Sequence, residues 1–137
     1  MTDPKNDEVF VDTSAFYAVL DADDDVHAQA STAWHGLIDG RRPLVTSSYV
    51  CVEASALVQA RLGMDAVRAL FQDVLPMVTV VTVDELLHTN AVETLLGANR
   101  RDLSLVDCVS FTVMRQRGIA AAFAFDRHFA EQGCGFV

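Results

Sequence analysis

The sequence predicts an α/β protein: a three-layer α/β/α sandwich with a mostly parallel sheet of four or five strands. Short apolar runs of strand-forming residues alternate with longer segments whose apolar residues have helical spacing. Alternation of this kind is typical of a parallel sheet that is covered by helices on both faces. Two of the strand-like runs also end in an aspartate, at Asp12 and Asp126, which is unusual for a purely structural element.

The first part of the chain is predicted to form a strand, two helices and a second strand. In the second of these helices, apolar residues recur every three or four positions, which indicates one buried side. Gly40 ends this helix and Pro43 follows it, as C-terminal signals predict. An acidic loop, DADDD, separates the two helices. The expected strands are 8–11 and 43–46, and the expected helices are 14–21 and 25–38.

The middle of the chain is predicted to form two helices and a strand. Ser47 or Ser48 is the expected cap of the first helix, and Asp65 is the expected cap of the second. Pro76 breaks the second helix. The run MVTVVTV that follows is rich in β-branched residues and is the clearest strand. The expected helices are 47–63 and 64–75, and the expected strand is 77–83.

The last third is predicted to contain two helices, a buried strand and a short terminal strand. The first helix starts at Asp84 and ends near Gly97. The second is capped by Ser104 and stopped by Gly118. The expected helices are 84–99 and 103–118, the expected strands are 119–125 and 134–137, and residues 127–133 are expected to form a turn.

Composition bounds the class of protein. The 137 residues fit one domain, predicted to span 1–137 with a flexible tail at 1–7. No apolar stretch is long enough to span a membrane, and the polar start is not a secretory signal. Three widely spaced cysteines imply no disulfide framework, which favours the cytoplasm. The net charge of −9 argues against a simple electrostatic binder of nucleic acid, unless acids gather around a divalent metal that inverts the local charge.

Four acidic residues are candidates for such a site. Asp12 and Asp126 follow buried strands, and ligands bind beyond the carboxyl ends of parallel strands. Glu53 falls on the apolar face of the 47–63 helix, where an unpaired charge is costly. Asp107 lies in the first turn of an almost wholly apolar helix. Together they predict a site for Mg²⁺, with Mn²⁺ as the alternative ion.

Each acid also has an ordinary structural interpretation. Asp12 is a suitable N-cap for the next helix, and Asp107 lies three residues after Ser104, as in a capping box. Asp126 fits a turn, and Glu53 could pair with Arg61. Other chemistries have weaker support, because the four histidines form no HExxH or Cys/His cluster and no glycine-rich phosphate loop or GxSxG motif occurs.

Four stretches in order along the chain resemble a known family. They are VFVDTSAF, TSSYVCVEASAL, LSLVDCVSF and AFAFDRHF. Together they resemble the PIN domain, with the closest likeness to the small VapC-type toxins of bacterial toxin–antitoxin pairs. The resemblance covers almost the whole chain, although residues 64–102 contain no motif that can be aligned. The family has a small polar residue two positions before the third acid, where this chain has Leu105, so Ser104 is given a capping role only.

The resemblance implies an α/β/α fold and a metal-dependent endoribonuclease that acts as a toxin. The acidic quartet of the family maps onto Asp12, Glu53, Asp107 and Asp126, and its hydroxyl residue maps onto Ser14, with Thr13 as the alternative. Asp12 and Asp107 would hold the principal Mg²⁺ or Mn²⁺ directly, while Glu53 and Asp126 would bind through water or hold a second ion. The implied partners are RNA, a cognate antitoxin and a second copy in a homodimer, with no membrane.

Three alternatives to this function differ in what they require. A phosphoacceptor domain needs a lysine near its acids, and the single lysine, Lys5, is in the N-terminal tail. A haloacid-dehalogenase-type phosphatase needs a second aspartate where Ser14 stands. The remaining alternative is a catalytically inactive PIN-like module that binds other proteins, against which the intact acid set argues.

Overall fold

The computed structural model describes residues 6–137, and its five strands form one sheet in the order β3-β2-β1-β4-β5. All four neighbouring pairs of strands are parallel. This confirms the predicted parallel sheet, in its five-stranded form. Of the tail predicted at 1–7, residues 1–5 lie outside the described residues, whereas Asn6 donates a hydrogen bond to the carbonyl of Arg117 (2.8 Å). The strands are β1 (Val9–Val11), β2 (Leu44–Ser47), β3 (Thr79–Val81), β4 (Ala121–Phe123) and β5 (Gly135–Phe136).

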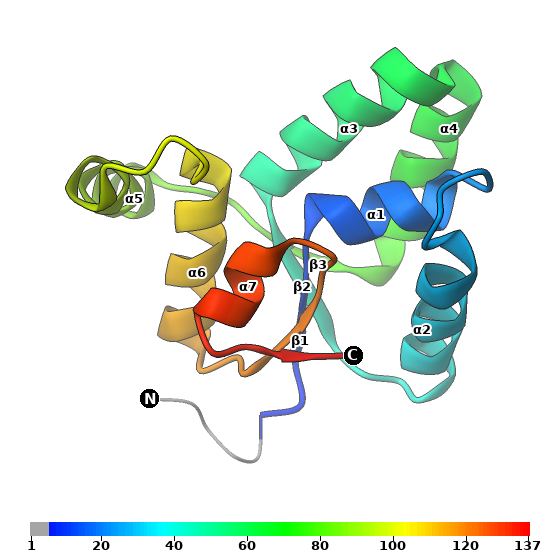
Figure 1. Ribbon diagram of the computed structural model, residues 1–137. Coiled ribbons are helices and arrows are strands. Elements are labelled where there is room, and N and C mark those ends of the chain that lie inside the picture. The colour runs from blue at the N-terminus through cyan, green and yellow to red at the C-terminus, as the bar shows by residue number, and fades with distance from the viewer. Residues whose placement is uncertain (1–5) are drawn as a thin grey trace.

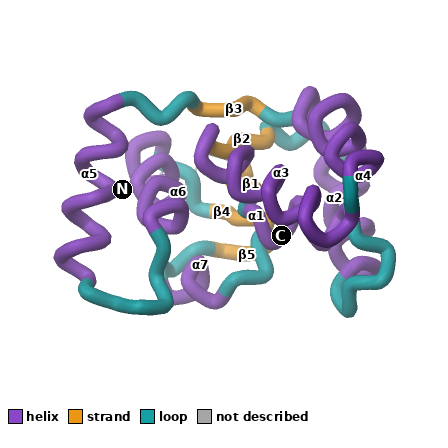
Figure 2. Tube along the Cα trace, turned by 90° about the horizontal axis from the view of Figure 1, so that it is seen from above, coloured by secondary structure: helices purple, strands orange, loops and turns teal. Residues whose placement is uncertain are grey.

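Helices cover both faces of the sheet. Seen along the sheet in Figure 2, α5, α6 and α7 lie on one side of the strands, and α1 to α4 lie on the other. Figure 1 shows the same division, so the predicted three-layer sandwich is confirmed. None of the helices in the described part of the chain is long and apolar enough to cross a membrane. The helices are α1 (Thr13–Leu20), α2 (His27–Asp39), α3 (Ser48–Leu62), α4 (Met64–Ala69), α5 (Glu85–Ala98), α6 (Leu105–Arg117) and α7 (Arg127–Glu131).

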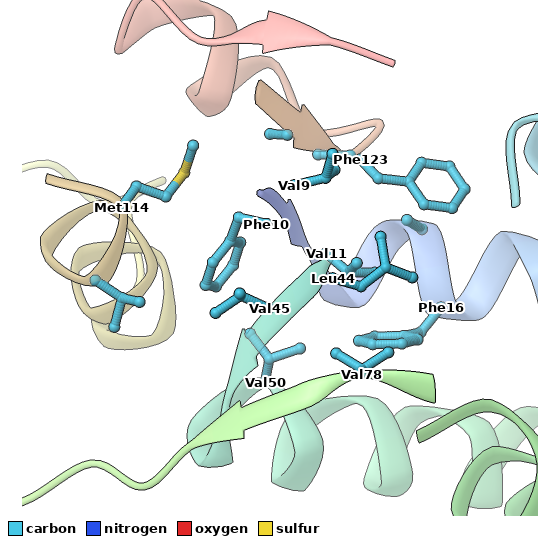
Figure 3. Packing of buried hydrophobic residues seen from close by; sticks show 14 of the residues in the cluster. Val9, Phe10, Val11, Phe16, Leu44, Val45, Val50, Val78, Met114 and Phe123 are labelled. Atoms are coloured by element: carbon cyan, nitrogen blue, oxygen red, sulfur yellow. The ribbon is translucent and has the colours of Figure 1, made fainter. Parts of the chain in front are cut away.

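The core is centred on β1, whose three residues are completely buried. Phe10 points towards the α6 side of the sheet (Figure 3), where its ring stacks on that of Phe129 with 6.2 Å between centroids. Phe129 also packs edge-on against Phe111 of α6, at 4.9 Å. These rings join the central strand, α6 and α7, and so fix the elements that carry the acidic residues.

Most of the predicted helix caps are confirmed. Ser47, Asp84 and Ser104 each accept a hydrogen bond from a backbone N–H in the first turn of the following helix. Gly118 ends α6 in the left-handed conformation, with φ of 70°. The helix predicted to end near Gly97 ends at Ala98, where Asn99 adopts the left-handed conformation that stops it.

Four local expectations are wrong. Asp65 does not cap α4; it lies within the helix and forms an ion pair with Arg68 at 3.0 Å. The predicted 64–75 helix changes to a π-helical turn at Leu70–Val74 and a 3-10 turn at Leu75–Met77, which contains the helix-breaking Pro76. The strand predicted at 77–83 is ordered as β only over Thr79–Val81, where it pairs with Val45–Ser47 of β2. The turn at 127–133 contains the short helix α7.

The position of Phe10 predicts a large loss of stability on truncation. Phe10→Ala is expected to lower the free energy of unfolding by about 3–5 kcal/mol, because it leaves a cavity beside the buried ring of Phe129. Phe71→Ala is the matched control, since that ring is 49% exposed and should cost less than about 1 kcal/mol. Urea denaturation measures both. Equal losses in the two variants would contradict the assignment of the core.

Candidate metal centre

Three of the four predicted acids meet at one edge of the sheet. Strands β1 and β4 are parallel neighbours, with Val11 opposite Phe123, so the two strands end side by side. The backbone N–H of Asp12 donates to the carbonyl of Phe123 at 3.0 Å and extends this pairing by one residue. Asp126 comes three residues after Phe123, the last residue of β4. Asp107 approaches the same end of the sheet from the first turn of α6.

Each of these three acids is held by the start of a helix. Asp12 caps α1 by accepting the N–H of Ser14 (3.2 Å), and Asp126 caps α7 by accepting the N–H of His128 (2.9 Å). Asp107 forms the predicted capping box with Ser104: it accepts the Ser104 N–H at 3.1 Å, and its own N–H donates to Ser104 Oγ at 3.0 Å. The positive end of each helix lies at a carboxylate, which is electrostatically favourable.

Capping uses only one oxygen of each carboxylate. The hydrogen bonds reach Oδ2 of Asp12, Oδ2 of Asp107 and Oδ1 of Asp126. Within residues 6–137, no hydrogen bond reaches the other oxygen of any of the three. The structural and the functional interpretations of these acids are therefore compatible, because a capped carboxylate keeps one oxygen available for a cation.

Ser14 connects two sides of this site. Its hydroxyl donates to Asp12 Oδ2 at 2.7 Å and accepts the backbone N–H of Phe125 at 2.9 Å. It therefore fixes Asp12 and the segment that leads to Asp126 at once. Thr13, the alternative hydroxyl, is buried and makes no hydrogen bond through Oγ1 within the described chain.

The acids lie in an unfavourable environment for negative charge. The pKa of Asp12 is raised from 3.8 to about 6, mainly by burial; the hydrogen bonds from Ser14 oppose the shift, and the charges of Asp107 and Asp126 add to it. Burial also raises the pKa of Asp107, and the charge of Asp126 contributes. A divalent cation bound by oxygen ligands would relieve both the desolvation and the repulsion.

His128 is a member of this cluster that the sequence did not predict. Its Nδ1 lies 2.7 Å from Asp126 Oδ1 and 3.7 Å from Asp107 Oδ2. Donor atoms of these three residues all lie within 4.8 Å of one another, which is close enough to hold one metal ion. The absence of HExxH and Cys/His patterns argues against a zinc site, but it does not exclude a single histidine beside the acids. The usable signal was a histidine two residues after a capping aspartate.

A network of charges lies behind His128. Oδ2 of Asp102 is 3.3 Å from Nε2 of His128 and 3.0 Å from both Arg100 and Arg127. Arg100 also contacts Glu131 at 2.9 Å. Hydrogen bonds from the two arginines hold the pKa of Asp102 well below its usual range. Burial lowers the pKa of His128, but the three neighbouring carboxylates outweigh it and leave that pKa raised.

The expectation that Glu53 lies on a buried face is wrong. Val50, Ala54 and Val58 are completely buried, whereas Glu53 is exposed. The buried stripe of α3 follows an i, i+4, i+8 row, and Glu53 lies about 100° of helix rotation from its centre. No ion pair joins Glu53 to Arg61 in the described chain; Arg61 lies over the ring of Tyr17 instead, 5.4 Å from its centroid. Neither Glu53 nor Asp12 is among the residues whose donor atoms cluster, although Asp12 is near enough to Asp107 and Asp126 for their charges to raise its pKa.

Comparisons with known proteins agree with this fold. The sequence model of the family described as PIN domain matches residues 9–133. VapC20 of Mycobacterium tuberculosis, a 23S rRNA-specific endonuclease, is 36% identical over 129 residues, which is 91% of this chain and 94% of that protein. The crystal structure of VapC20, described as a sarcin–ricin loop cleaving toxin, has a TM-score of 0.79 and 34% identity, and covers 92% of this chain and 95% of its own.

More distant structures share the fold alone. FitAcB from Neisseria gonorrhoeae has a TM-score of 0.67 at 15% identity, covering 94% of this chain and 96% of its own. PAE2754 from Pyrobaculum aerophilum has a TM-score of 0.65 at 20% identity, and the match covers 98% of this chain and 91% of PAE2754.

The buried charge of Asp12 predicts that Asp12→Asn stabilises the metal-free protein. A raised pKa means that this carboxyl group favours the folded state below pH 3.8 and loses that contribution as the pH rises through about 6. At pH 7.5 with a chelator, the variant should gain up to about 3 kcal/mol over the wild type, and the gain should shrink towards pH 4.5. Urea denaturation at the two pH values measures it.

Asp25→Asn is the control for this prediction, because it makes the same substitution at an exposed acid. It should change stability little at either pH. A loss of stability in Asp12→Asn at pH 7.5 would mean that its capping role outweighs the repulsion among the acids.

Proposed function

Because the chain belongs to the PIN domain family, we propose that it is a divalent-metal-dependent endoribonuclease that acts as the toxin of a toxin–antitoxin pair. The observation that carries the proposal is the meeting of Asp12, Asp107 and Asp126 at the carboxyl edge of the sheet, where burial and mutual repulsion raise the pKa of Asp12 to about 6. VapC20, 36% identical over most of this chain, is an endonuclease. That likeness favours activity over the alternative of an inactive binding module.

The residues of the site fit Mg²⁺ or Mn²⁺. Asp12 and Asp107 would hold the principal ion through their uncapped oxygens, while Asp126 and the exposed Glu53 would act through water or hold a second ion. When bound, such an ion lowers the pKa of a coordinated water and stabilises negative charge on a phosphate. Oxygen ligands with a local excess of negative charge are what these hard cations require.

The remaining residues position the acids and the substrate. The Ser14 hydroxyl keeps Asp12 in one orientation by donating to Oδ2. Arg127 is adjacent to Asp126 in sequence, and its side chain remains 74% exposed although it pairs with Asp102. It can therefore contact an RNA phosphate without leaving the ion pair. A fixed guanidinium beside the acids offsets part of the repulsion between RNA and a protein of net charge −9.

RNA is the substrate class, and the sarcin–ricin loop of 23S ribosomal RNA is the first target to test, by analogy with VapC20. The cytoplasm is the compartment that this role requires.

A cognate antitoxin and a second copy of the chain are the proposed protein partners. Large apolar side chains are exposed on the helices at 47–75, which we propose for such contacts: Val52, Met64 and Phe71. Leu86 and Leu96 of α5 add two more, at 69% and 72% exposure. Exposed apolar residues of this size are typical of surfaces that bind other proteins.

RNA cleavage is predicted to depend on the clustered acids and on a divalent ion. Asp12→Asn and Asp107→Asn should each lower the rate of cleavage of a sarcin–ricin loop RNA by more than about 100-fold, the upper range for residues that merely support a ligand. A chelator should abolish cleavage by the wild type, and added Mn²⁺ or Mg²⁺ should restore it. Gel analysis of labelled RNA measures the rates.

Asp25→Asn is again the control and should cleave at the wild-type rate. Wild-type cleavage by Asp12→Asn would refute the assignment of the site. A wild-type protein that binds metal, shown by a rise in melting temperature, but cleaves no RNA in a broad panel would favour the inactive binding module.

Glu53 is predicted to act in catalysis without contributing to stability. Because its side chain is exposed, Glu53→Gln should leave the melting temperature unchanged. It should reduce cleavage at least about 10-fold if it holds metal through water or directly. Glu93→Gln, at an exposed site on α5, is the matched control. Full activity in Glu53→Gln would remove this residue from the site.

A further inference from the structure

We propose that Nδ1 of His128 is itself a ligand of the divalent ion, supported by Asp102, and that this nitrogen shifts the preference of the site from Mg²⁺ towards Mn²⁺. The inference rests on the proposed function, because it refines the composition of the same metal site. It adds one ligand, from α7, to a set that otherwise contains only carboxylates.

His128 is placed as a ligand would be. Only 7% of the residue is exposed, and its Nδ1 faces the acids, 2.7 Å from Asp126 Oδ1 and 3.7 Å from Asp107 Oδ2. The side chain has little freedom to turn away, because the next residue, Phe129, is wholly buried between Phe10 and Phe111.

Nδ1 has no hydrogen-bond partner among the described residues. The contact with Asp126 is short, but its direction does not satisfy a hydrogen bond, and the same Oδ1 already accepts the backbone N–H of His128. A nitrogen lone pair and a carboxylate oxygen at 2.7 Å repel each other unless Nδ1 carries a proton or a cation lies beside both atoms. Buried polar atoms without partners are rare in folded proteins, and some of them mark the position where an ion binds.

The other ring nitrogen is engaged in the way that metal-bound histidines require. Nε2 lies 3.3 Å from Asp102 Oδ2, and the ion pairs with Arg100 and Arg127 keep that carboxylate charged and in place. With the proton on Nε2 donated to Asp102, Nδ1 keeps its lone pair for the site. A carboxylate behind the histidine is the common second partner of a metal ligand, where it fixes the tautomer and the orientation of the ring.

A nitrogen ligand changes which ion the site favours. Carboxylates and water suit both Mg²⁺ and Mn²⁺, but imidazole is a ligand of transition metals rather than of Mg²⁺. Mn²⁺ accepts oxygen and nitrogen together, so the mixed set selects it over Mg²⁺. The competing interpretation is a protonated His128 that serves only as a counter-ion to the acids and contacts no metal.

Pulsed electron paramagnetic resonance of the Mn²⁺-loaded protein distinguishes the two. The full chain is prepared with natural histidine and with ¹⁵N-histidine. A directly bound imidazole gives a ¹⁴N coupling that changes to a ¹⁵N coupling on labelling, and we expect this in the wild type. The coupling should disappear in His128→Gln and remain in His35→Gln, a control at an exposed histidine of α2.

Mn²⁺ and Mg²⁺ titrations give a second measure. His128→Gln should weaken Mn²⁺ binding about 10-fold or more and Mg²⁺ binding less, so the ratio of the two affinities falls. Asp102→Asn should weaken Mn²⁺ binding while the nitrogen coupling persists, because the ligand remains and only its support is altered. If His128→Gln does not fold, a chain with the other three histidines changed to glutamine leaves His128 as the only histidine, and the coupling is expected to remain in it.

The outcomes separate the two proposals. Mn²⁺ that binds, and is lost in Asp12→Asn, but shows no nitrogen coupling in the wild type would overturn the ligation by His128 and leave the proposed nuclease intact. A coupling that survives in folded His128→Gln would overturn it as well. No Mn²⁺ binding to the wild type at millimolar concentration would overturn the metal site as a whole.

Discussion

The burial of carboxylates that also repel one another is the constraint on which this structure depends. Asp12 is 3% exposed and Asp107 8%, so water does little to separate their charges. Three helix starts oppose that repulsion, since each gives a backbone N–H to one carboxylate oxygen. The fold thus holds the acids at a fixed place while leaving them short of positive charge. A bound cation would supply the positive charge that the described residues leave short.

The same local chemistry that makes an acid a good helix cap also makes it a useful ligand. A cap fixes the backbone and one oxygen, and leaves the second oxygen free of the helix it starts. In the capping box of α6, the carboxylate of Asp107 accepts the N–H of Ser104, and the N–H of Asp107 donates to Ser104 Oγ. Both the backbone and the side chain of Asp107 are therefore held in place. Two further side chains hold the acids in place. Ser14 joins Asp12 to Phe125 through its hydroxyl, and His128 of α7 lies against Asp107 of α6. Rigid placement of this kind reduces the reorganisation needed on binding.

The order of strands and helices and most caps could be predicted from the sequence, because capping and β-branching act within a few residues. The meeting of Asp12 with Asp126 could be inferred from general properties of parallel sheets. Three features could not. The width of the buried stripe on α3 depends on its neighbours, which is why Glu53 was misplaced. The length of β3 depends on its pairing with Val45–Ser47 of β2. The contact between Asp102 and His128 joins residues 26 apart, and no local pattern marks it.

The burial of Phe129 affects how mutational data on this protein should be interpreted. This ring lies beneath α7, in contact with Phe10 and Phe111, and its backbone continues directly from His128. A scan of variants scored by toxicity in growing cells would therefore report an aromatic residue without any reactive group as essential. Its loss would loosen the attachment of α7 rather than remove a participant in the reaction. The effect of a substitution at Phe129 therefore measures how well α7 packs on the core, not whether Phe129 takes part in the reaction.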